Sequence, residues 1–172
     1  MSKVKNLAYI GLMSAIMCIL SPITIPLSGG VGVTLGIFVI MFMTYVMGMG
    51  RTLICYGIYL LLGIVGLPVF AGFQGGVGAL LGPTGGFLVG YVAVIVSEGL
   101  MLKIKEKRLF LVIGSVIGLL LCYILGCLWY MRIMDVNFVG ALWMCVIPFV
   151  AFDGMKVAMV CVIGPPCKKR VK

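Results

Sequence analysis

The stretch from Gly66 to Tyr91 reads GLPVFAGFQGGVGALLGPTGGFLVGY and contains no charged residue. It lies between two apolar runs that are each long enough to enter a bilayer. Large apolar side chains alternate with its glycines, which indicates close packing against apolar surroundings. Irregular backbone at membrane depth is tolerated only where it is buried in protein or lines a cavity. We therefore expect this segment to lie beside a cavity in a membrane protein.

The composition around this stretch excludes a soluble protein. Hydrophobic residues make up 63% of the 172 residues and charged residues 10%, whereas an ordinary soluble domain carries about 25% charged residues. No charge occurs from Asn6 to Gly50 or from Thr52 to Ser97, and each gap has room for two spans of about 20 residues. Leu109 to Met131 supplies a further span, and the region after Asn137 supplies one more.

These spans predict one domain over residues 1–172, an all-α integral membrane protein. It is a bundle of six transmembrane helices with a glycine-rich outer loop between the third and fourth. Prolines and glycines set the expected boundaries, because proline cannot continue a helix. The expected helices cover about residues 5–21, 33–48, 52–66, 83 to the basic KIKEKR turn at 103–108, 109–131 and 148–164. Residues 138–147 are expected to lie along the outer interface.

Lysine and arginine fall in alternate connections, which indicates the orientation. The connections on the other side of the membrane contain one basic residue, Arg132, and its charge is balanced by Asp135. The basic positions are Lys3, Lys5, Arg51, Lys103, Lys105, Lys107, Arg108, Lys168, Lys169, Arg170 and Lys172. We expect a multi-pass protein of the cell membrane with both termini in the cytoplasm. The net charge of +9 is then a topology signal, and nucleic-acid binding is disfavoured.

Asp153 and Lys156 are the charges predicted to lie inside the membrane. They are three residues apart, so they project from one face of the last helix, roughly 8 to 12 Å below its outer end. A structural ion pair is the alternative, but such a pair adds little stability over apolar packing. We therefore favour a ligand site. Glu98 is interpreted as interfacial, within reach of Lys103 and Arg108.

The glycine segment supports two interpretations. It lacks a phosphate-binding loop motif, which argues against a nucleotide site. It can be a compact outer cap, or it can form part of a ligand wall where bare backbone N–H groups approach a polar group. The residues of that wall would be Gln74, Gly75, Gly76, Thr84 and Gly85.

Two further patterns concern partners and cofactors. Gly11 and Ala15 form a small-xxx-small pair beside Ser14, where another helix can approach, either from this protein or from a partner.

Histidine is absent and the seven cysteines lack CxxC spacing, so we expect no disulfide, no metal and no resident cofactor.

Three motifs, in order along the chain, resemble one family. They are IPLSGGVGVTLG at Ile25–Gly36, the glycine segment, and PFVAFDGMK at Pro148–Lys156. Together they are similar to the BioY family, the biotin-binding S components of energy-coupling factor (ECF) transporters. The resemblance implies a six-helix membrane protein that takes up biotin from outside with high affinity. It also implies a transmembrane T component and two ATPase subunits as partners, which use the ATP.

The resemblance also implies roles for individual residues. Asp153 and Lys156 match the family's D-x-x-K and become the leading biotin contacts, while Gly82–Gly86 match its GPTGG. Gly11 and Ala15 match the small-residue motif that docks the T component. The chain departs from the family at two places: it has Gly36 where a glutamine is common, and Ala151-Phe152 where the family has Pro-Gly.

For biotin we predict a narrow pocket in the outer half, closed by the loop at residues 22–32 and by the glycine segment. Phe73, Tyr91 and Trp143 are the aromatic candidates for its walls. Two alternatives stay open. One is an S component for another vitamin, riboflavin or thiamine. The other is a small intramembrane enzyme, for which the sequence offers no catalytic group that we can assemble.

Overall fold

The protein is a helical bundle, and the computed structural model describes residues 3–26, 30–105 and 107–171. Within these ranges lie six helices of 12 residues or more, which confirms the predicted bundle. They are α1 Lys3–Leu20, α2 Gly36–Met47, α3 Met49–Val65, α5 Gly85–Ile104, α6 Arg108–Met134 and α8 Ile147–Val171. The remaining elements are short: β1 Thr24–Ile25, β2 Val33–Thr34, the 3-10 turn η1 Ala71–Phe73, α4 Val77–Leu81 and α7 Phe138–Cys145.

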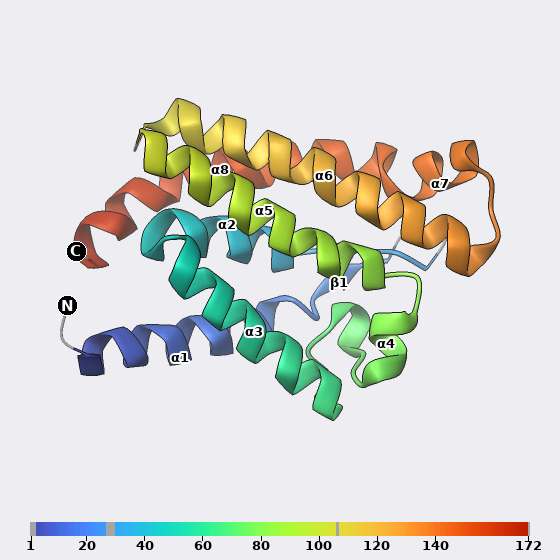
Figure 1. Ribbon diagram of the computed structural model, residues 1–172, viewed down its shortest axis with the longest axis horizontal. Helices are drawn as coiled ribbons and strands as arrows, with labels where there is room; N and C mark the ends of the chain where they lie inside the picture. The colour runs from blue at the N-terminus through green and yellow to red at the C-terminus, as the bar shows by residue number, and fades with distance from the viewer. Residues whose placement is uncertain (1–2, 27–29, 106, 172) are drawn as a thin grey trace.

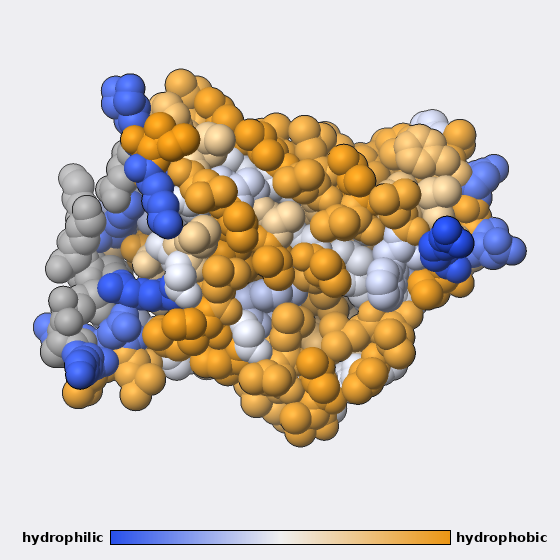
Figure 2. Space-filling model, in the orientation of Figure 1, coloured by the Kyte–Doolittle hydropathy of each residue, from blue (hydrophilic) through white to orange (hydrophobic). Residues whose placement is uncertain are grey.

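The surface of the bundle matches a bilayer. By length and composition α1, α5, α6 and the segment 138–168 can each cross a membrane, and α2 and α3 are shorter apolar helices. Figure 2 shows apolar side chains across the middle of the molecule, with hydrophilic residues at its two ends. This distribution is that of an integral membrane protein.

The two ends of the bundle hold different elements. Both chain termini and the α2–α3 and α5–α6 connections lie at one end, which we call the terminal end (Figure 1). Helices α4 and α7 lie toward the opposite end, which we call the cap end. The connections therefore alternate between the two ends, as the positions of lysine and arginine predicted.

Helices α5 and α6 pack closely through glycines. A Cβ atom on Gly118 would lie 2.7 Å from the Cα of Val94, and one on Gly126 would overlap the ring of Phe87. Small residues let membrane helices approach one another at this distance. These glycines therefore let α5 and α6 lie in close contact.

The second helix begins later than predicted. Residues 33 and 34 form strand β2, which pairs antiparallel with β1 so that Thr34 lies opposite Thr24. The Oγ1 of Thr34 then accepts a hydrogen bond from the backbone N–H of Gly36, at 3.2 Å. The backbone of these residues is thus used by the hairpin, and α2 starts only at Gly36.

The last helix extends further than predicted. We expected it to stop at Gly164, but α8 continues through Pro165 and Pro166 to Val171. Packing on Tyr45 of α2 accounts for this: a Cβ on Gly164 would lie 2.6 Å from its ring, and Lys168 Nζ lies 4.8 Å from the ring centroid. At the other end of α8 the prediction holds, because α7 is separate and Pro148 lies in the first turn of α8, where its missing N–H costs nothing.

The glycine segment forms a compact cap. The N–H of Gly72 donates to the carbonyl oxygen of Pro22 (3.1 Å) and to Oγ1 of Thr24 (2.8 Å), which joins this segment to the β1 hairpin. The N–H of Gly76 donates to the carbonyl oxygen of Gly63 at 2.7 Å. The segment therefore packs on neighbouring backbone at the cap end of the bundle.

Candidate functional site

Asp153 and Lys156 line a cavity near the cap end of the bundle. Its empty space is about 560 Å³, but only about 40 Å³ is wide enough for the centre of a water molecule. The loop residues Val31 and Gly32 and the glycine-segment residues Phe70 and Ala71 contribute to its lining. A narrow pocket between these two loops is what the sequence predicted.

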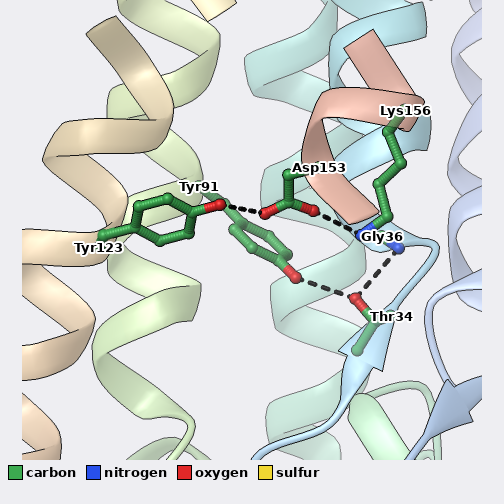
Figure 3. Close-up of polar contacts among 6 residues, drawn as sticks. All are labelled: Thr34, Gly36, Tyr91, Tyr123, Asp153 and Lys156. Carbon is green, nitrogen blue, oxygen red and sulfur yellow. Dashed lines mark hydrogen bonds and ion pairs between the residues drawn. The ribbon is translucent and has the colours of Figure 1, made fainter. Parts of the chain in front are cut away.

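The ion pair is the polar centre of this cavity. Lys156 Nζ donates to Asp153 Oδ1 at 2.7 Å, and the Tyr123 hydroxyl of α6 donates to Asp153 Oδ2 at 2.6 Å (Figure 3). Asp153 is only 1% exposed and Lys156 7%. The i, i+3 spacing puts both charged side chains on one face of α8. Both carboxylate oxygens of Asp153 therefore have a donor inside the bundle.

A second set of polar side chains in the cavity comes from other parts of the chain. Tyr91 of α5 and Thr34 of β2 share a hydrogen bond between their hydroxyl oxygens, at 3.1 Å (Figure 3). Ser21 and Tyr59 share another, at 2.8 Å. Each of these four side chains also lines the cavity. The cavity therefore also presents hydroxyl groups from parts of the chain other than α8.

Aromatic rings form much of the remaining wall. The rings of Phe87 and Phe149 stack at 6.2 Å with 17° between their planes, and Tyr59 meets Phe70 edge-on at 5.5 Å. All four side chains line the cavity. Such a wall suits a flat or slender apolar body, and the few polar groups can fix its orientation.

Four of the residues predicted for the site are brought together here: Thr84, Tyr91, Asp153 and Lys156. The other two aromatic candidates are elsewhere, because the side chain of Phe73 is 67% exposed and that of Trp143 is 65% exposed. Neither lines the cavity. Their predicted place in its walls is therefore corrected.

The glycine-segment wall also needs correction. Gln74, Gly75, Gly76 and Gly85 do not line the cavity. The N–H of Gly76 donates to Gly63, and that of Gly85 donates to the Gly82 carbonyl at 3.1 Å, so neither N–H is open to a ligand. Gly75 and Gly85 instead pack closely against backbone carbonyls within the cap, and Gly76 supplies a φ of +85°.

Glu98 was predicted to lie at the membrane interface, and this prediction is wrong. Its side chain is fully buried between α5 and α6, where Oε2 accepts a hydrogen bond from Ser115 at 3.1 Å. Its Oε1 has no hydrogen-bond partner among the described residues. The glycine at position 114 lets α6 approach Glu98 closely enough to cover it, since a Cβ there would lie 2.7 Å from the Cα of Glu98.

The small pair on α1 is on the surface. Gly11 and Ala15 are both exposed, and a Cβ on Gly11 would meet nothing within 4 Å. Ser14 beside them is buried and donates to the carbonyl of Ile10. The pair therefore does not serve packing among this protein's own described helices.

Sequence reasoning missed four polar residues of the cavity: Ser21, Thr34, Tyr59 and Tyr123. Thr34 lies within the motif at residues 25–36, which was a usable signal. Tyr123 is one of seven tyrosines and lies 30 residues from Asp153, so nothing in the sequence links the two. The glycine at position 36, where a glutamine is common in the family, has a structural reason. A Cβ there would lie 2.8 Å from the hydroxyl oxygen of Ser21.

The fold and the cavity define a class: a polytopic membrane protein that encloses a narrow, largely aromatic pocket with one buried ion pair. A small solute with an apolar body and a few polar groups fits such a pocket. The particular family follows from sequence comparison. The chain belongs to the BioY family, whose family model matches residues 1–172.

Individual relatives agree with this assignment. The chain is 36% identical to biotin transporter BioY2 of Lactococcus lactis subsp. cremoris over 95% of its length and 90% of the relative's. It is 34% identical to biotin transporter BioY of Thermotoga maritima, over 96% of both chains. It also resembles the crystal structure of the S-component for biotin from an ECF-type ABC transporter, with a TM-score of 0.88, 26% identity, and coverage of 98% of this chain and 95% of that one.

Proposed function

We propose that this chain is the membrane-embedded S subunit of an ECF transporter and that it binds biotin for high-affinity uptake. The observation that carries the proposal is the Asp153–Lys156 pair, which is buried yet faces a cavity. The relatives named as biotin transporters support the choice of ligand. Because they are transporters, the alternative of an intramembrane enzyme is set aside.

The ureido ring of biotin is the end that we place at the ion pair. This ring offers two N–H donors and one carbonyl acceptor, which match the Asp153 carboxylate and the Lys156 ammonium. In the opposite orientation the carboxylate of biotin would lie close to Asp153. Two like charges repel strongly in a low-dielectric site. The thiophane ring and the chain then lie along the aromatic wall that includes Phe87 and Phe149.

The partner proteins are a T component and two ATPase subunits. The chain has no phosphate-binding loop of its own, so energy from ATP has to come from other subunits. The exposed Gly11 and Ala15 offer the α1 face on which a helix of the T component can pack. We place the terminal end of the bundle in the cytoplasm, since the basic connections lie there.

Equilibrium binding tests the proposal directly. Purified protein in detergent is titrated with biotin, dethiobiotin, lipoate, riboflavin and thiamine by calorimetry. We expect biotin to bind at least about 100-fold more tightly than riboflavin or thiamine, because a site built for specific polar groups rejects ligands that leave them unpaired. Tighter binding of riboflavin or thiamine would make the chain an S component for that vitamin.

A further inference from the structure

A second hollow opens at the terminal end of the bundle, away from the ligand cavity. It has about 650 Å³ of room for water-sized molecules, against about 40 Å³ in the cavity. It lies between the α2–α3 connection, the end of α5 and α8. We call it the basic hollow because its lining includes Arg51, Lys103, Lys105 and Lys168. The proposed binding of biotin makes no use of it.

The described lining of the basic hollow carries positive charge only. Three of the four acidic residues of the chain, Glu98, Asp135 and Asp153, do not line it. The fourth, Glu106, lies outside the described residues. Cations gathered in a recess attract anions more strongly than the same cations spread over a surface.

The start of helix α3 adds to this field. The helix begins at Met49, and Gly48, Met49 and Arg51 all line the basic hollow. No acidic residue stands in its first turn, and no side chain caps it. The first N–H groups of a 17-residue helix carry partial positive charge and favour an anion such as phosphate. The arginine beside them can pair with phosphate oxygens in a bidentate way.

One exposed apolar side chain lines the same hollow, and a second lies one helical turn from a lining residue. Ile104, which lines it, is 62% exposed, and Ile54, one turn after Arg51, is 53% exposed. In a membrane protein such side chains face lipid chains. A ligand with an anionic head and apolar chains uses both features, whereas a free phosphate ion uses only the first.

We propose that the basic hollow binds the phosphate headgroup of an anionic phospholipid. The headgroup lies among Arg51, Lys103 and Lys105 at the start of α3, and an acyl chain runs along Ile54 and Ile104. Basic recesses between membrane helices are suited to anionic headgroups because the charge adds to the affinity that the chains supply. The lipid would anchor the terminal end of the bundle without contacting the biotin cavity.

Native mass spectrometry of the purified full chain in detergent tests this proposal, with phosphatidylglycerol and phosphatidylcholine as probes. The test variant is Arg51→Gln/Lys103→Gln/Lys105→Gln. The matched control is Lys3→Gln/Lys5→Gln/Lys107→Gln, which removes three charges outside the lining of the hollow. Biotin titration of both variants reports whether they fold.

We expect the wild type to prefer phosphatidylglycerol and the test variant to bind it roughly tenfold or more weakly. The control should stay within about twofold of the wild type, since its lysines lie outside the hollow. Equal loss in both variants, or no preference for phosphatidylglycerol in the wild type, would overturn the proposal.

Two further experiments distinguish binding of a lipid from binding of a soluble anion or of a protein. Displacement of phosphatidylglycerol by millimolar glycerol 3-phosphate would assign the hollow to a soluble anion and overturn the lipid assignment. Unchanged lipid binding by the test variant, with loss of assembly with the ATPase subunits, would make the hollow a protein-docking site. Loss of biotin binding by the wild type would concern only the proposed function.

Discussion

The cap end and the terminal end of the bundle bury their carboxyl groups in different ways. At the cap end Asp153 has a cation at 2.7 Å and faces a cavity. Toward the terminal end Glu98 has only the hydroxyl of Ser115, and its second oxygen has no partner in the described part of the chain. The difference shows that burial of an acid does not by itself mark a ligand site. The acid at the proposed ligand site also has a balancing charge and an adjoining cavity.

The first way to break this comparison is to remove each acid in turn. Asp153→Asn leaves Lys156 as an uncompensated buried charge, so we expect a loss of about 3 kcal/mol in the free energy of unfolding. Glu98→Gln should change it by less than about 1 kcal/mol, because the amide keeps the shape of the side chain and its oxygen can still accept the hydrogen bond from Ser115. Unfolding of both variants in mixed micelles with SDS gives the two values. Equal losses would mean that the two sites do not differ.

The second prediction concerns the cation. Lys156→Ala strands Asp153 in the cavity and removes the donor that we propose for biotin, so the affinity for biotin should fall by more than about tenfold. Calorimetry of the purified variant measures it. Lys168→Ala is the matched control, since that lysine is on the same helix but lines the basic hollow. Unchanged affinity of the Lys156 variant would refute its role.

Tyr123→Phe sharpens the account of the ion pair. It removes one hydroxyl donor to Asp153 while keeping the ring, and a hydrogen bond to a charged group is worth about 1.5 kcal/mol or more. Some of this loss can be recovered by water, so we expect roughly fivefold weaker biotin binding in the same titration. Tyr130→Phe, on the same helix and outside the cavity lining, is the control. A variant with wild-type affinity would show that the hydroxyl only supports the fold.

The smallest effect is expected at the corrected aromatic positions. Phe73→Ala and Trp143→Ala remove exposed side chains that do not line the cavity. Biotin affinity should stay within about twofold of the wild type, since surface substitutions usually change little. A clear loss in either variant would mean that the ligand-bound cavity includes residues that the present structure places outside it.

Much of the bundle could be predicted from sequence because lipid imposes strong constraints on composition. The Asp153–Lys156 pair could also be predicted, since charge inside an apolar span is conspicuous and the two residues share a helix face. The contacts of Asp153 with Tyr123 and of Tyr91 with Thr34 join residues 30 and 57 positions apart. Such pairs depend on how helices pack, and no periodicity within one helix reveals them.

The glycine segment was harder to interpret for a different reason. Glycine permits close approach of any partner, whether that partner is a ligand or neighbouring backbone. In this chain Gly75 lies against the carbonyl of Leu67, and Gly85 lies against that of Leu80. A glycine-rich composition is therefore compatible both with a ligand wall and with packing against neighbouring backbone. Glu98 was misplaced similarly, because its burial depends on Gly114 of another helix.

The hydrogen bonds from Gly72 to Pro22 and Thr24 have a consequence for variation among homologues. The donor and one acceptor are backbone atoms, so most substitutions in either loop leave that bond intact. Loops joined in this way can diverge in side chains and still meet at the same place. Selection for closing the pocket would then act mainly on backbone shape, and it would favour glycine at position 72, where φ is +70°.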